Sequence, residues 1–312
     1  MQQRKPVVLL MGPTASGKTA LAMELYDRMP TEIISVDSAM IYRGMDIGTA
    51  KPDVETLARY PHKLVDIREP DQAYSAAEFR SDVLALIEQA HENGKLPVLT
   101  GGTMMYFNAL VKGLADLPEA DAAIRQQLLE QAEAEGWPAI HARLAEVDPE
   151  SAKRLAPNDS QRLQRALEVY LLTGKPMSWH WAQQQKQQLP YNVLSLAVMP
   201  EQRSVLHERI ELRFMQMLEQ GFIDEVEQVL WQRGDLHLQM PSVRCVGYRQ
   251  VWEYLAGNYD REMMIHKGIV ATRQLAKRQV TWLRSWENLH WLDSLDKKLS
   301  DNALKLVESV II

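Results

Sequence analysis

Residues 12–19 read GPTASGKT, a complete phosphate-binding loop of the form G-x-x-x-x-G-K-T. The loop directly follows the apolar run at residues 7–11 and precedes the helical pattern TALAMELYDRM, which is the context that the motif requires. Backbone N–H groups of such a loop and of the following helix converge on one spot and favour anionic oxygens there. The chain is therefore predicted to bind a diphosphate or a triphosphate.

Two side chains of the loop have separate predicted roles. Lys18 adds a point charge to the terminal phosphates. The Thr19 hydroxyl can join a Mg²⁺ that bridges the phosphate oxygens, because this hard cation takes oxygen ligands and keeps its remaining waters. Mg²⁺ is thus the expected cofactor, with Thr19 as its protein ligand. The predicted phosphate-binding residues are Gly12, Pro13, Thr14, Ala15, Ser16, Gly17, Lys18 and Thr19.

Composition narrows the class of protein without naming a reaction. A chain of 312 residues with 46% hydrophobic residues can bury a sizeable core, as one large domain with an insert or as two domains. The apolar run before the loop is far too short for a membrane span or a signal sequence, so a cytoplasmic protein without membrane contact is expected. We also expect a monomer. The single cysteine, Cys245, excludes an internal disulfide and is typical of a small buried side chain rather than a nucleophile.

The order of apolar segments predicts an α/β fold. Strand-like and helix-like periods alternate from residue 7 to about residue 111, as a parallel sheet with crossover helices requires. Residues 117–188 show helix signals only, and 191–198 look like a strand that rejoins the sheet. We predict a P-loop NTPase-like parallel sheet flanked by helices, formed by residues 1–113 and 191–312, with an all-helical insertion at 114–190. The predicted strands are residues 7–11, 32–36, 63–67, 96–100 and 191–198.

Polar residues follow two further predicted strands. Asp37 ends the second strand, and carboxyl ends of adjacent parallel strands face the same crevice, so Asp37 should lie near the bound phosphates. Its carboxylate could hold Mg²⁺ through water, accept a proton from a nucleophile, or cap the turn after it. Thr103, which follows Gly101 and Gly102, could present its hydroxyl to the same crevice or cap a helix. Arg213 lies on the polar face of a predicted helix, where a solvated arginine is usual.

Six further motifs make the pattern specific. After the phosphate loop come DSAMIYRGMDIGTAKP at 37–52, PHKLVDI at 61–67, YSAAEFR at 74–80, GGTMMY at 101–106, RCVGYRQ at 244–250 and ATRQLAKRQVTWLR at 271–284. This succession, which covers residues 7 to about 284, resembles the bacterial tRNA dimethylallyltransferase (tRNA isopentenyltransferase) family. The resemblance implies transfer of a dimethylallyl group from dimethylallyl diphosphate to N6 of the adenosine on the 3′ side of the tRNA anticodon. DSAMIY replaces the DSRQVY of many members, and the zinc-finger extension of eukaryotic relatives is absent.

The same resemblance implies roles for single residues. Asp37 would take the proton from the attacking adenine amine, and Thr103 would lie against the target adenosine. Arg213, in the segment RIELRF, would reach the diphosphate together with Lys18. The implied catalytic residues are Asp37, Thr103, Lys18 and Arg213.

A tRNA substrate requires a basic surface, although the formal net charge is −6. Residues 240–286 hold eight Lys and Arg against three Asp and Glu, a local excess of five positive charges. Four aromatic residues, Tyr248, Trp252, Trp282 and Trp286, could stack on bases, but their four-residue spacing also fits core packing. A second basic patch is expected on the insertion. The predicted tRNA-binding residues are Asp37, Ser38, Ala39, Met40, Thr103, Arg125, Gln161, Arg162, Leu163, Gln164, Arg165, Arg244, Cys245, Val246, Gly247, Tyr248, Arg249, Lys277, Arg278, Gln279 and Arg284.

Two alternative functions share part of this pattern. A P-loop small-molecule kinase would use the same loop with ATP, and the helical insertion could then be its lid. A prenyltransferase acting on free adenylate would need the loop and Asp37, but not the basic stretch near the C-terminus.

Overall fold

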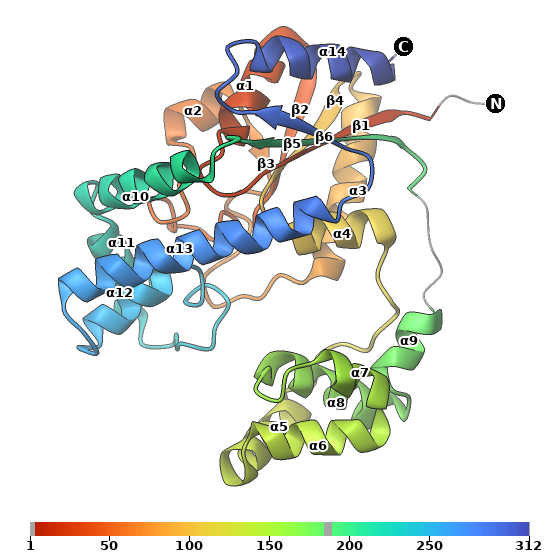
Figure 1. Cartoon of the computed structure of the whole chain (residues 1–312), viewed down its shortest axis with the longest axis vertical. Helices are drawn as coiled ribbons and strands as arrows, with labels where there is room; N and C mark the ends of the chain where they lie inside the picture. The colour runs from red at the N-terminus through yellow and green to blue at the C-terminus, as the bar shows by residue number, and fades with distance from the viewer. Residues whose placement is uncertain (1–3, 184–188, 312) are drawn as a thin grey trace. The chain divides into compact units, whose positions relative to one another are not determined.

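The computed structural model describes residues 4–183 and 189–311, which Figure 1 shows as helices and strands. The chain divides into two compact units, Met1–Ala109 with Pro190–Ile312, and Leu110–Leu189. The sheet therefore comes from two separate stretches of sequence, with the helical unit between them. The unit boundaries lie within four residues of the predicted boundaries 113/114 and 190/191. Within the described ranges, no helix is both long and apolar enough to cross a membrane.

The first unit is built on a six-stranded sheet with the order β3-β2-β4-β1-β5-β6. Every pairing in it is parallel. The strands are β1 (Pro6–Met11), β2 (Thr31–Val36), β3 (His62–Lys63), β4 (Leu96–Gly101), β5 (Asn192–Met199) and β6 (Leu289–Asp293). The prediction of a parallel α/β sheet that β5 rejoins is confirmed.

Helices cover both faces of this sheet and extend beyond its carboxyl edge. The helices that begin in this unit are α1 (Lys18–Arg28), α2 (Val54–Arg59), α3 (Ala76–Glu92), α4 (Met104–Lys112), α10 (Arg203–Glu219), α11 (Phe222–Val229), α12 (Tyr248–Leu255), α13 (Arg261–Arg284) and α14 (Leu299–Ile311), with a short 3₁₀ turn at Trp231–Arg233. In Figure 1, α10 and α13 run side by side, and the two helices are in contact.

The core explains why the strands read as continuous apolar runs. Every residue of β4 and all of β1 except Pro6 are buried, because helices pack on both faces of a parallel sheet. Val8, Leu10 and Val98 pack on one face with buried residues of α1 and α14. Helix α3 contacts β2 and β4.

The second unit has its own small core. Its helices are α5 (Ala122–Glu135), α6 (Trp137–Val147), α7 (Pro149–Arg154), α8 (Ser160–Thr173) and α9 (Met177–Gln183). The predicted helix signals are confirmed where Asp121 accepts a hydrogen bond from the Ile124 N–H, and where Gly136 and Gly174 end helices with positive φ. Leu128, Ile140, Leu144, Leu163 and Leu167 are fully or almost fully buried between these helices.

Two strand predictions differ from the structure. The predicted strand at 63–67 is wrong: only His62 and Lys63 pair with β2, and Leu64 and Asp66 then adopt φ of 63° and 55°, which turns the chain away from the sheet. The edge strand β6 was not predicted. Its residues are only partly buried, so its sequence, LHWLD, lacks the apolar run that marks the inner strands.

Leu163 was predicted to contact tRNA, but its side chain is fully buried in the core of the helical unit. We therefore expect Leu163→Ala to lower the free energy of unfolding of this unit by about 2–5 kcal/mol, the usual cost of removing a buried leucine. Leu171→Ala on the same helix is the matched control, because Leu171 is 38% exposed and its loss should cost within about 0.5 kcal/mol. Hydrogen exchange of α5, α6 and α8 in the full chain measures both effects. Equal protection in the two variants would contradict the burial of Leu163.

Candidate functional site

A cavity of about 600 Å³ lies at the carboxyl ends of the central strands. Its lining includes the segments that leave β1, β2 and β4, together with residues from α10 and α13. A site at this edge is what parallel pairing predicts, because the loops that follow adjacent strands must emerge together.

The phosphate loop forms one wall of the cavity. The strand, loop and helix context is confirmed, since β1 ends at Met11 and α1 begins at Lys18. Gly17 adopts φ of 95°, a conformation that L side chains rarely adopt, so this position requires glycine. Thr14, Ala15, Lys18 and Thr19 line the cavity, while Gly12, Pro13 and Ser16 are buried beneath them.

Lys18 is partly buried, and its ammonium forms no ion pair with a carboxylate among the described residues. Its Nζ donates a hydrogen bond to the Pro13 carbonyl oxygen, at 3.2 Å. Burial lowers the pKa of Lys18 to about 8, although the nearby Asp37 carboxylate opposes this change and Arg213 adds to it. An anion bound in the cavity would supply the negative charge that favours the ammonium form.

Arg213 faces the cavity from α10. Burial lowers the pKa of its guanidinium, and the Asp37 carboxylate opposes that change. Arg213 is therefore not the solvated arginine that is usual on a polar helix face. On the same face of α10, Arg209 donates a hydrogen bond to the Ser294 hydroxyl at 3.0 Å. Lys18 and Arg213 together give the cavity two partly buried cations.

Asp37 and Thr103 lie on the loops after β2 and β4 and both line the cavity. Oδ1 of Asp37 accepts hydrogen bonds from the N–H groups of Ala39 (2.8 Å) and Met40 (3.3 Å). Oγ1 of Thr103 accepts a hydrogen bond from the Ser38 N–H at 3.0 Å and donates one to the Ser38 hydroxyl at 3.3 Å. Asp37 therefore caps its turn, and these bonds also fix the orientation of its carboxylate.

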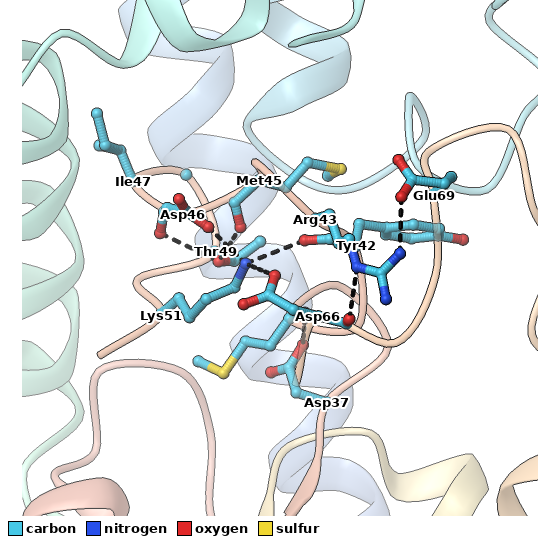
Figure 2. A network of polar contacts seen from close by, with 12 residues as sticks. Asp37, Tyr42, Arg43, Met45, Asp46, Ile47, Thr49, Lys51, Asp66 and Glu69 are labelled. Atoms are coloured by element: carbon cyan, nitrogen blue, oxygen red, sulfur yellow. Dashed lines mark hydrogen bonds and ion pairs between the residues drawn. The ribbon is translucent and has the colours of Figure 1, made fainter. Parts of the chain in front are cut away.

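The segment between Ser38 and Pro52 is held by a buried lysine that sequence reasoning missed. The Lys51 side chain is 3% exposed, and its ammonium contacts the carboxylates of Asp46 and Asp66. It also donates a hydrogen bond to the Tyr42 carbonyl oxygen at 3.0 Å, as Figure 2 shows. Unlike Lys18, Lys51 is neutralised by carboxylates within the fold.

Glu225 on α11 holds the same segment from the outside and was also missed. Its carboxylate accepts hydrogen bonds from the N–H groups of Asp46 (3.0 Å), Ile47 (2.6 Å) and Gly48 (3.1 Å). The Tyr248 hydroxyl donates a fourth bond to it at 2.6 Å. Glu225 lies more than 170 positions after Asp46, Ile47 and Gly48 in the sequence, so no local sequence pattern identifies it.

The predicted tRNA-binding residues of the first unit separate into three groups. Ser38, Ala39, Met40, Arg244, Cys245 and Val246 line the cavity beside Asp37 and Thr103. Lys277, Arg278 and Arg284 are exposed on α13, where Arg278 also lines the cavity, and Arg249 is exposed but paired with Glu253. The third group consists of Gly247, Tyr248 and Gln279, which are buried.

Burial corrects the predicted RNA contacts of Tyr248 and Gln279. Tyr248 is completely buried and bonds to Glu225, so its ring cannot stack on a base. Gln279 is 8% exposed, and both ends of its amide bond to protein backbone.

Cys245 donates its S–H to the Pro241 carbonyl oxygen. Burial, with the Asp37 carboxylate nearby, raises the pKa of its thiol to about 12. This thiol is unsuited to nucleophilic attack.

The basic patch of the helical unit is largely neutralised within that unit. Arg125 and Arg165 both pair with Glu168, whose side chain is fully buried. Burial alone would raise the pKa of Glu168, but its bonds to both arginines and to the Asp121 N–H lower it. Gln164 donates to the Arg125 carbonyl oxygen, whereas Gln161 and Arg162 are exposed. The exposed charge of this patch is therefore smaller than the sequence indicates.

Comparisons with known proteins agree on one family. The model of the family "IPP transferase" matches residues 40–286. A curated relative, "tRNA dimethylallyltransferase 2" from Hahella chejuensis, is 56% identical over 315 residues, covering 97% of this chain and 95% of that protein. The match to the family model begins after the phosphate loop and Asp37. The matches to full-length relatives extend over these residues as well.

Solved structures give the same result. A full-length tRNA isopentenylpyrophosphate transferase from Bacillus halodurans is 37% identical with a TM-score of 0.70, covering 99% of this chain and 98% of that one. A eukaryotic dimethylallyltransferase acting on tRNA is 26% identical with a TM-score of 0.82, covering 96% of this chain and 78% of that one.

The lowered pKa of Lys18 predicts how anion binding depends on pH. Affinity for inorganic diphosphate should fall as pH rises through about 8, because the ammonium attracts the anion and the neutral amine does not. Binding near that pH should also take up protons, since the anion favours the charged form. Lys18→Arg keeps its charge throughout, so its titration shows only the ligand's own protonation. Calorimetry in buffers of different ionisation enthalpy measures both quantities. Identical pH dependence in wild type and variant would show that Lys18 does not titrate in this range.

Proposed function

The chain belongs to the IPP transferase family, and on that premise we propose that it transfers a dimethylallyl group from dimethylallyl diphosphate to N6 of the adenosine next to the 3′ side of the tRNA anticodon. One observation carries the proposal: one wall of a single cavity holds the phosphate loop with Lys18 and, from α10, Arg213, and a neighbouring wall holds Asp37 and Thr103 at the ends of β2 and β4. The first wall suits a leaving diphosphate, and the second suits a nucleophile that must lose a proton.

The phosphate wall acts on the leaving group. As the allylic C–O bond breaks, its electron pair goes to the diphosphate, whose negative charge increases. Lys18, Arg213 and the loop amides are in place before the bond breaks, so they stabilise the charge where it develops. This is the same arrangement that holds a γ-phosphate in nucleotide-dependent enzymes, applied here to a departing group.

Mg²⁺ is part of the proposal. Among the described residues there is no group of three or more His, Cys, Asp or Glu that could hold a metal alone. A Thr19 hydroxyl at the cavity wall, completed by diphosphate oxygens and waters, fits the habit of Mg²⁺ in phosphate sites. When bound, the ion would neutralise part of the diphosphate charge.

Asp37 is proposed to act on the nucleophile. The lone pair of the adenine N6 amine is delocalised into the ring, which makes the amine a weak nucleophile. As the new C–N bond forms, the amine becomes acidic, and a carboxylate hydrogen-bonded to it can take the proton. Thr103 bonds to Ser38 beside Asp37 and is proposed to contact the same adenosine. The proton ends on Asp37, and diphosphate leaves.

The proposed RNA surface is formed by α13 and the rim of the cavity. Trp282 is 43% exposed, lines the cavity and can stack on an extruded base. The other three aromatic side chains that could have stacked on bases contact the protein instead. Tyr248 and Trp252 are buried, and Trp286 donates a hydrogen bond from Nε1 to the Ser195 hydroxyl. The cytoplasmic location, the monomeric state and the RNA contacts of the helical unit remain predictions.

A direct assay separates the proposed function from its alternatives. Purified protein is incubated with dimethylallyl diphosphate and Mg²⁺, together with either unmodified tRNA or AMP, and in parallel with ATP and no prenyl donor. The proposal requires prenylated tRNA only. Prenylated AMP would indicate a free-adenylate enzyme, and ADP formation would indicate a kinase; the names of the relatives favour neither.

Asp37→Asn tests the general base. The amide keeps an oxygen for the N–H groups of Ala39 and Met40, so the turn should persist. Prenyl transfer at saturating substrates should fall by about 10²–10⁴, the range for a lost general base, with nearly unchanged donor affinity. Single-turnover kinetics and donor titrations measure the two effects. A parallel loss of donor affinity would assign Asp37 to the metal instead.

Neutralising the exposed charges of α13 tests the tRNA surface. Replacing Lys277 and Arg278 with glutamine should weaken binding about equally for different tRNAs, because phosphate contacts carry no sequence information. The slope of log affinity against log salt should flatten by about one to two units. Lys297→Gln with Lys298→Gln is the matched control, an adjacent exposed pair outside the cavity lining. An unaltered slope in the first variant would leave tRNA binding to other residues.

A further inference from the structure

Gln279 is a buried residue of α13, although the two residues just before it are exposed. Lys277 and Arg278 are exposed on α13, whereas Gln279 is 8% exposed. Its Oε1 accepts a hydrogen bond from the N–H of Thr14 in the phosphate loop, at 2.9 Å. Its Nε2 donates a hydrogen bond to the carbonyl oxygen of Gly102 after β4, at 3.0 Å. One side-chain amide therefore joins the two walls of the cavity.

The chemistry of these two partners requires a primary amide of this length. A backbone N–H can only donate and a carbonyl oxygen can only accept, so the bridging side chain must present one acceptor and one donor. Glutamate lacks the donor, lysine lacks the acceptor, and methionine of similar length lacks both. Gly102 has to be glycine to admit the amide, because a Cβ there would lie 2.3 Å from Gln279 Nε2.

The bridge lies where the sheet stops fixing the distance between the two walls. The ladder between β1 and β4 ends at the pair Met11 and Gly101, so Thr14 and Gly102 are beyond it. On the β4 side, the residue after Gly102 is Thr103, which bonds to the backbone of Val36 and to Ser38. Gln279 is thus connected through short bonded steps to the turn that orients the carboxylate of Asp37.

We infer that Gln279 is a positioning residue that holds the phosphate loop and the turn after β4 at a fixed separation, and so sets the approach of the nucleophile to the diphosphate-bearing carbon. This inference rests on the proposed function. Gln279 then has a role inside the protein instead of the predicted contact with tRNA. It lies on α13, whose outer face is proposed to bind tRNA. Misplacing reacting groups by about 1 Å can cost about 100-fold in rate, so a small change in this separation is enough to be measured.

Single-turnover kinetics of Gln279→Met test the inference. At saturating donor and tRNA, the rate constant of prenyl transfer should fall about 10- to 100-fold, because both bonds are lost while the side-chain length is kept. The dissociation constant of tRNA should stay within about threefold, since the side chain does not reach the surface. Gln274→Met, at an exposed position of the same helix, is the matched control and should retain the wild-type rate. Weaker tRNA binding with an unchanged rate constant would overturn the inference in favour of a direct RNA contact.

Gln279→Glu gives a readout that a loss of stability would not produce. The new carboxylate keeps an acceptor for the Thr14 N–H but places a second acceptor against the Gly102 carbonyl oxygen. When protonated, it can again donate to that oxygen, so the ratio of variant to wild-type rate should rise as pH falls. Taking the ratio removes the titration of groups common to both proteins. The charged or titratable groups lining the cavity are Lys18, Asp37, His62, Arg213, Arg244, Cys245 and Arg278, with the tyrosines Tyr42, Tyr74, Tyr106 and Tyr248. A ratio that does not change with pH would overturn the inference.

The wild-type measurement separates failure of this inference from failure of the proposed function. If the wild-type protein does not prenylate tRNA, the proposed function fails and Gln279 is not at issue. If the wild type is active and Gln279→Met is equally fast, the inference alone fails. Donor affinity, measured for each variant, shows that the phosphate loop is still folded.

Discussion

Parallel pairing of β1 with β4, and of β4 with β2, is the constraint on which the site depends. In this register, Met11 and Val36 both lie opposite Gly101, so the three strands end at one level. The phosphate loop, the Asp37 turn and the Thr103 turn then leave the sheet side by side. Antiparallel pairing would send neighbouring ends to opposite edges and separate the cations from the carboxylate.

Two lysines of the cavity region, Lys18 and Lys51, differ in how their positive charge is compensated. Lys51 has carboxylate partners in Asp46 and Asp66, and its role is complete within the fold. Lys18 has a carbonyl partner, and it shares the influence of Asp37 with Arg213. Two partly buried cations without a carboxylate in direct contact destabilise the fold until an anion binds, and the binding free energy then offsets that cost. In the proposed function, the diphosphate supplies this negative charge.

The sequence predicted the sheet and the phosphate loop because both follow from local patterns. Apolar runs mark buried strands, and the loop motif is contiguous, so β1, β2, β4 and β5 were found within a few residues. What failed depended on contacts that no local pattern shows. Gln279 bonds to residues 265 and 177 positions away, and the prediction grouped it with its exposed neighbours Lys277 and Arg278 as a tRNA contact.

An acidic protein that binds a polyanion must leave some cations without internal partners, and the two candidate surfaces differ in this respect. In the helical unit, Glu168 takes up Arg125 and Arg165, so counting arginines overstated the charge available to RNA. On α13, Lys277 and Arg278 are exposed and directly precede the inward-facing Gln279. The inner face of the same helix holds the phosphate loop through the bond from the Thr14 N–H to Gln279. If tRNA contacts the outer face as proposed, one helix contacts the RNA and positions the loop that holds the donor, so both substrates are aligned through a single element.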